Sequence, residues 1–228
     1  MTSLRALVAA LLAAPVVLSG CAGESPAPSP SSTTTTTTSA PAPTESNRQR
    51  YSVTRTSIEG MTLDRNGTWQ AEFGQLAGGD PAVVEAFNGA SQAAVHRQVD
   101  EATADTRDGT TSWRLESRGQ VSFRRIAIAQ RINGTLDYGA HPSTYVGTVV
   151  IDSRNAKPIT LANLFADERA GLQRLSEQTT LAPVEKNFAN WIPTADGIEI
   201  HGLPQTVTVA WAALTDVLAP GMVELAQN

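Results

Sequence analysis

The spacing of apolar residues changes along the chain and predicts one long helix among several strands. The clearest helical pattern follows Asp80-Pro81, which supply an N-capping carboxylate and a proline for the first helical position. Core-facing positions then recur every three or four residues, at Val84, Phe87, Ser91, Val95 and Val99. This spacing predicts a helix that runs to about Thr103 with one face on the core.

Elsewhere, apolar residues alternate with polar ones, as in strands that have one buried face. The strands predicted from this pattern lie at 51–58, 67–73, 113–116, 121–132, 145–151, 197–201 and 206–211. Asn133-Gly134 is a turn signal between two of these runs. Three tryptophans follow the apolar pattern and are expected in the core, whereas Trp69 is expected to be the exposed one.

Shorter helices are predicted in the second half of the chain. Thr160 precedes Leu161 and Leu164 as a helix cap, a second helix is expected over 167–179, and a last short one around Leu214. The strands do not alternate regularly with helices as in a parallel sheet. We therefore expect an α+β fold, a single domain with a mostly antiparallel sheet and helices packed on one face.

The first twenty residues are typical of a secretory signal. A basic start (Met1 to Arg5) precedes thirteen uncharged residues, fewer than the roughly 20 that a membrane-spanning helix needs. The run ends in Leu18-Ser-Gly-Cys21, which resembles the lipobox of bacterial lipoproteins. That resemblance implies a signal peptide over 1–20, a lipid anchor on Cys21 and a location on the outer face of the cell membrane. An ordinary secretory signal followed by a plain thiol is the alternative.

Residues 21–50 are rich in Pro, Ser and Thr and have almost no apolar side chains to bury. Such a segment is expected to be a disordered linker that separates the domain at 51–228 from the membrane. Its threonine run, Thr33 to Thr38, is also compatible with a glycosylated stalk. Lysine is rare beside arginine, which indicates a GC-rich genome of the actinobacterial kind.

Composition narrows the functional classes. The 228 residues contain 17 Lys and Arg against 22 Asp and Glu, for a net charge of −5. This balance argues against nucleic acid as a partner, because phosphates require a clustered basic surface. The single cysteine, Cys21, excludes an internal disulfide and a zinc site built from several thiolates.

No familiar catalytic or cofactor motif is present. The sequence has no phosphate-binding loop, no dinucleotide-binding glycine pattern and no nucleophile elbow, so no cofactor and no catalytic residue is assigned. None of the three histidines (His96, His141 and His201) has a partner four residues away for a shared metal, and no metal site is expected. His141 lies in Tyr138-Gly-Ala-His-Pro, which fits a tight turn better than a catalytic base.

Several short blocks, taken in order, resemble the RsiV-like extracytoplasmic domain. They are Tyr138 to His141 with the strand from Tyr145, Lys157 to Phe165, Phe188 to Trp191, Thr194 to Ile198, and Val207 to Trp211 with Leu214. This family includes mycobacterial secreted immunogenic antigens and the lysozyme-sensing part of an anti-sigma factor. The similarity is strongest after Tyr138, which makes Tyr138, His141 and Tyr145 the candidate ligand-binding residues.

The resemblance implies a fold and an extracytoplasmic setting more than a reaction. The chain shows no transmembrane span or sigma-binding segment, and His201 to Pro204 is shorter than the aromatic, acidic connection that the family often has there. We therefore expect a non-catalytic, membrane-anchored lipoprotein that binds a protein or cell-envelope ligand. The alternatives are an envelope hydrolase with an unrecognised site that includes His141, or an accessory subunit of an envelope complex.

Overall fold

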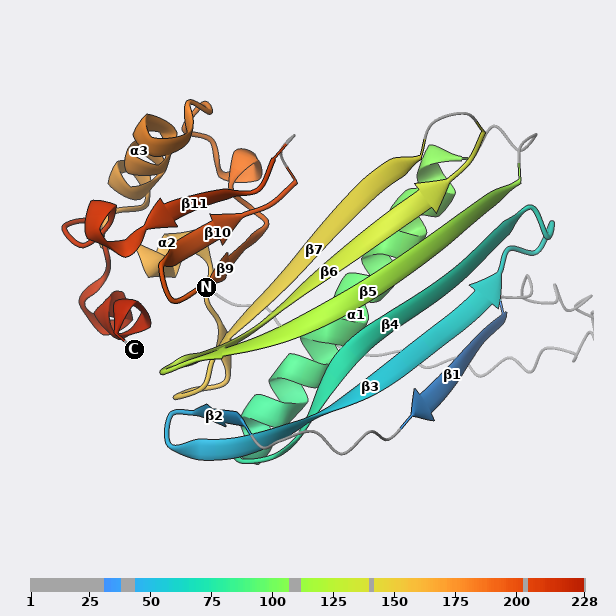
Figure 1. Ribbon diagram of the computed structural model, residues 1–228, viewed down its shortest axis with the longest axis horizontal. Coiled ribbons are helices and arrows are strands. Elements are labelled where there is room, and N and C mark those ends of the chain that lie inside the picture. Colours follow the sequence, from blue (N-terminus) through green and yellow to red (C-terminus); the bar gives the residue numbers. More distant parts are fainter. Residues whose placement is uncertain (1–30, 38–43, 107–111, 140–141, 203–204, 228) are drawn as a thin grey trace, which may run out of the picture.

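The computed structural model describes residues 31–37, 44–106, 112–139, 142–202 and 205–227. A long, twisted sheet carries a long helix on one face and a smaller lobe at one end (Figure 1). Its strands are β1 (Ser31–Thr37), β2 (Thr44–Ser46), β3 (Gln49–Met61), β4 (Gly67–Gly78), β5 (Trp113–Arg124), β6 (Ala127–Asp137), β7 (Ser143–Asp152) and β8 (Lys157–Pro158). Their order is β1-β3-β4-β5-β6-β7-β8, with β2 paired to β3. The predicted α+β fold and single domain are confirmed.

One crossover shapes the sheet. β4 and β5 are parallel neighbours, and the other neighbouring strands run antiparallel. Helix α1 (Pro81–Asp105) returns the chain from the end of β4 to the start of β5, as a parallel connection requires. The Asp80 carboxylate accepts the Ala82 N–H at 2.8 Å, and Pro81 begins the helix. The predicted helix is therefore confirmed, with its end at Asp105.

The helix covers an apolar face of the sheet. Near its start, Phe73 from β4 and Phe87 from α1 lie in one buried cluster. Near its end, Trp69 stacks on Trp113 with ring centroids 6.5 Å apart. Trp69 is only 5% exposed, so the prediction that it is the exposed tryptophan is wrong. Trp69, Ala71 and Phe73 share the face of β4 that packs under the helix.

The C-terminal residues form a lobe that packs against the end of β6 and β7 (Figure 1). It contains α2 (Leu161–Leu164), α3 (Glu168–Thr179), the antiparallel strands β9 (Trp191–Pro193), β10 (Gly197–Ile200) and β11 (Val207–Ala210), and the 3-10 helices η1 (Glu185–Asn187), η2 (Trp211–Ala213) and η3 (Pro220–Ala226). Ile126, in the β5–β6 turn, and Val150 of β7 share a buried cluster with Trp191 and Trp211. The helix predicted around Leu214 is instead a single 3-10 turn, η2.

The predicted turn at Asn133-Gly134 is wrong, because both residues lie inside β6. A Cβ at Gly134 would lie 3.0 Å from both Gln98 Oε1 and Ser117 Oγ. The absence of a side chain at Gly134 therefore lets Gln98 and Ser117 pack against the backbone of β6, and this close contact explains a glycine inside a strand. The β5–β6 hairpin turns eight residues earlier, between Arg124 and Ala127.

Parts of the predicted linker over 21–50 lie within the described residues. Of these, Ser31–Thr37 and Thr44–Ser46 are strands that pair with β3. Ser46 is 1% exposed, and its Oγ lies 2.7 Å from the Arg124 carbonyl oxygen. The folded unit therefore includes residues before Tyr51. In the described part of the chain, no helix is both long and apolar enough to cross a membrane.

Candidate functional site

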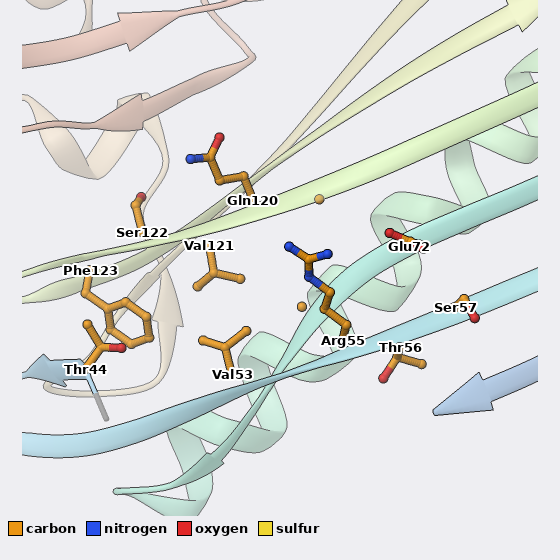
Figure 2. Close-up of a pocket in the computed structure, with 12 residues that line it drawn as sticks. Thr44, Val53, Arg55, Thr56, Ser57, Glu72, Gln120, Val121, Ser122 and Phe123 are labelled. Atoms are coloured by element: carbon orange, nitrogen blue, oxygen red, sulfur yellow. The ribbon is translucent and has the colours of Figure 1, made fainter. Parts of the chain in front are cut away.

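The parallel pair β4–β5 is joined along only half of its length. The strands are paired from Gly67↔Trp113 to Glu72↔Arg118, and beyond this point they separate. The far end of the opening is closed where Asn47, in the turn after β2, donates its N–H to the Arg125 carbonyl at 2.7 Å. The result is a cleft of about 840 Å³ between β3–β4 and β5, on the side of the sheet away from α1 (Figure 2).

The walls of this cleft, which we call the split-sheet cleft, combine apolar and polar groups. Val53 of β3 faces Val121 and Phe123 of β5 across the opening (Figure 2). Phe123 also contacts Tyr51, with ring centroids 6.2 Å apart. The polar part of the lining consists of Thr44, Arg55, Thr56, Ser57, Glu72, Gln120 and Ser122. Ligand sites in proteins have this character, an apolar surface with a few polar groups that fix orientation.

The floor of the cleft is made by Gly74 and Gly119, and the buried amide of Gln130 packs directly against both glycines. Because β5 has diverged, the Gly74 N–H has no strand partner there, and Gln130 Oε1 accepts it at 2.6 Å. Gln130 is fully buried, and its Nε2 has no hydrogen-bond partner among the described residues. This donor is enclosed by the protein, so Gln130 shapes the cleft by holding the Gly74 backbone and not by contact with a ligand.

Side chains take the place of the missing neighbour strand along β4. Asn88, on α1, accepts the Leu76 N–H at 2.7 Å through Oδ1 and donates Nδ2 to the Leu76 carbonyl at 3.0 Å. Together with Gln130, this residue satisfies backbone groups that would otherwise be open to another strand. The opening is therefore a built feature of the fold, and a ligand in it would contact mainly side chains.

The charged residues of the lining are Arg55, which is exposed, and Glu72. Glu72 forms a long ion pair with Arg118, 3.8 Å from Oε2 to Nε, at the last β4–β5 pair. An exposed pair of this kind contributes little to stability. Arg55 and Glu72 carry opposite charges, so the rim of the cleft has no strong electrostatic potential of either sign.

Two of the three predicted ligand-binding residues, Tyr138 and Tyr145, lie away from the split-sheet cleft. Tyr138 follows β6 and Tyr145 is in β7, and both are half-buried against the Trp69–Trp113 cluster. The structure thus brings these two residues to the same end of the sheet, but neither lines the split-sheet cleft. His141, the third of the set, and the lipidation residue Cys21 lie outside the described residues.

Tyr145 is tied to the end of α1, where its O–H donates to the Asp105 carboxylate. Burial, reinforced by Asp105 and by the nearby Tyr138 and Glu101, raises the pKa of Tyr145 well above its usual value. The phenol therefore keeps its proton at neutral pH. Its arrangement is that of a packing group and not of a general base.

His201 follows β10 directly, which confirms the prediction that it ends a strand. It lies beside a polar pocket of about 280 Å³, with Nδ1 3.2 Å from Thr206 Oγ1 and Nε2 3.7 Å from Glu199 Oε1. Burial and the positive charge of Arg131 lower the pKa of His201 in spite of Glu199. The imidazole is therefore held neutral. In the described ranges, no three His, Cys, Asp or Glu side chains come together as potential metal ligands.

The pattern of apolar and polar residues does not predict the split-sheet cleft. Two glycines next to predicted strands, Gly74 after 67–73 and Gly119 between 113–116 and 121–132, were the available signal, since a strand glycine often marks a bend or a close approach. A Cβ at Gly74 would lie 2.3 Å from Val121 Cγ2, and one at Gly119 would lie 3.0 Å from Phe73 Cα. Gln130, however, falls in an alternating strand pattern and carries no sequence signal for its position at the floor.

No family model matches the sequence, and no curated protein matches it. The fold is similar to the 2.15 Å crystal structure of a DUF3298 family protein from Pseudomonas aeruginosa PAO1. The TM-score is 0.50 at 10% sequence identity, and the similarity covers 77% of this chain and 97% of that chain. At this level of identity, the two proteins share a fold, and the similarity carries no statement about activity.

Proposed function

We propose that this protein is an extracytoplasmic lipoprotein of the RsiV-like kind whose domain binds a protein or cell-envelope ligand without catalysis. The anchor is the part that the sequence supports, through the charged start, the apolar run and Cys21 after Leu18-Ser-Gly. Two acyl chains on one cysteine give stable membrane attachment, whereas a single chain does not.

The observation that carries the binding role is the split-sheet cleft. It is large enough for several sugar or amino-acid units, its walls are of mixed polarity, and an exposed arginine, Arg55, lies in its lining. Hydroxyl and amide groups dominate its polar lining, and such groups suit a ligand with amides and hydroxyls of its own. Peptides and cell-wall glycopeptides both have this chemistry.

A binding assay with a charge reversal tests the proposal. Full-length lipidated protein in mild detergent would be incubated with soluble peptidoglycan fragments, with lysozyme and with secreted proteins, and retention would be measured. We expect at least one of these to be retained, and Arg55→Glu at the cleft rim to weaken retention at least about tenfold, as expected for removal of a charged hydrogen bond or ion pair.

Arg169→Glu on α3 is the matched control, because it makes the same charge change on an exposed residue of the lobe. It should leave retention unchanged. Retention of nothing by the unaltered protein, or equal losses in the two variants, would remove the cleft as the binding site. Turnover of a wall substrate that His141→Ala abolishes would instead favour the hydrolase alternative.

A further inference from the structure

The N-terminal segment enters the sheet beside the β3–β4 turn. β1 runs antiparallel to β3 with Ser31 opposite Met61 and Thr37 opposite Arg55. The chain then continues in the same direction to β2, where Thr44 lies opposite Tyr51. The segment that leads back to Cys21 therefore starts from the end of the sheet where β3 turns into β4, and not from the end where β2 lies.

The reach of that segment restricts how the domain can stand on a membrane. Ten residue steps separate Cys21 from Ser31, and a fully extended chain of this length spans at most about 36 Å. β3 has 13 residues, so the sheet is about 40 Å long along it. If the domain stood with the start of β3 on the membrane, Ser31 would lie beyond the reach of the anchor. With the β3–β4 turn toward the membrane, by contrast, Ser31 is well within reach of the anchor, so the length of the segment favours that end.

This turn also displays apolar side chains to solvent. Met61 is 45% exposed and Leu63 is 60% exposed, and the third large exposed apolar residue in the described ranges, Val184, lies in the lobe. The turn is held in shape by hydrogen bonds, with the Thr62 N–H donating to the Gly67 carbonyl at 2.9 Å and the Arg65 N–H to that of Thr62 at 3.0 Å. Leu63 is therefore presented at a fixed place on a defined loop.

We propose that the β3–β4 turn docks on the outer leaflet of the membrane, with Met61 and Leu63 inserted among the lipids. The inference rests on the proposed lipid anchor at Cys21. The charges of Asp64 and Arg65 in the turn oppose each other, so apolar contact and not lipid charge provides the attraction. Ser57 and Val53 of the cleft lie four and eight residues from Met61 along β3, so the split-sheet cleft extends from about 13 to about 25 Å above the lipid surface and is open to large ligands.

Fluorescence quenching from the bilayer tests this orientation. Cys21 is the single cysteine and its thiol is consumed by lipidation, so Leu63→Cys gives the lipidated full-length protein one free thiol for an environment-sensitive dye. The labelled protein would be reconstituted in phosphatidylcholine–phosphatidylglycerol vesicles that contain a lipid-borne spin-label quencher. We expect dye at position 63 to be quenched severalfold more strongly than dye at position 184 in the control Val184→Cys.

Flotation of the same vesicles separates the two ways in which the inference can fail. If the protein floats with the vesicles and positions 63 and 184 are quenched equally, the anchor is present and the proposed orientation is wrong. If unlabelled, unsubstituted protein does not float, the lipid anchor itself is wrong and the orientation is overturned with it. Circular dichroism of both variants confirms that each one is folded, as expected for substitutions at exposed residues.

Discussion

The two halves of the β4–β5 pair show how one sheet supports both a rigid core and an opening. In the half near the β3–β4 turn, which we call the joined half, the strands are hydrogen-bonded and Trp69 and Trp113 stack beneath them. In the half with the split-sheet cleft, the same strands separate, and Gln130 and Asn88 supply the backbone partners. The joined half is closed by large apolar groups, and the split half is kept open by two amides.

The difference teaches where binding capacity arises in this fold. An amide side chain that caps a strand satisfies the backbone but leaves room beside it, whereas a neighbouring strand fills that room. Because Gly74 and Gly119 have no side chains, neighbouring groups pack directly against their backbone at the floor of the cleft. The joined half thus contributes mainly to stability, and the split half contributes a surface for recognition.

The largest effect is expected from Trp113→Ala in the joined half. Trp113 is 6% exposed, and its ring occupies the space where a Cβ at Gly67 would lie, so truncation leaves a cavity between stacked elements. We expect the free energy of unfolding to fall by about 3–5 kcal/mol in chemical denaturation. Arg114→Ala, at the neighbouring exposed residue, should change it by less than about 0.5 kcal/mol. Similar values for the two variants would contradict a core role for this half.

The sequence predicts the joined half better than the split half, for physical reasons. Trp113 and Leu115 alternate with charged residues, and this pattern predicts which face of β5 is buried. The capping residues Asp80 and Pro81 predict where α1 begins. The separation of β4 from β5 has no such local signature, because it depends on Gln130 reaching Gly74 across 56 positions of sequence. The turn predicted at Asn133-Gly134 is wrong for a similar reason. Gly134 is explained by its contacts with Gln98 and Ser117, which are distant in sequence, and not by a turn.

An intermediate effect is expected from Gln130→Ala in the split half. The Gly74 N–H would be left buried without its acceptor, which costs about 1–3 kcal/mol of unfolding free energy. Hydrogen exchange at Gly74 should accelerate selectively, while exchange in the paired segment at Ala71 stays slow. Gln70→Ala is the control, because Gln70 lies exposed on the same strand. Equal exchange rates at Gly74 in the two variants would show that Gln130 does not hold the cleft floor.

The smallest effect is expected from removing tyrosine hydroxyls, one from each half. Burial raises the pKa of both Tyr145, beside the joined half, and Tyr51, beside the cleft, and Asp105 raises that of Tyr145 further. The folded protein therefore keeps phenolic protons that the unfolded chain releases above about pH 10. The stabilisation is complete below that pH and is lost as pH rises through the higher folded-state pKa values.

Tyr145→Phe should cost about 1 kcal/mol near neutral pH, because the hydrogen bond to Asp105 is lost. Its disadvantage should shrink as pH rises above about 10, since phenylalanine has no proton to release. Urea unfolding near pH 8 and near pH 11 would measure both values, with Tyr51→Phe as the comparison. We expect a smaller pH-dependent change for Tyr51→Phe, because no carboxylate hydrogen bond adds to its burial. A larger pH-dependent change in unfolding free energy for Tyr51→Phe than for Tyr145→Phe would contradict this prediction, because the more strongly perturbed tyrosine would then be the one beside the cleft.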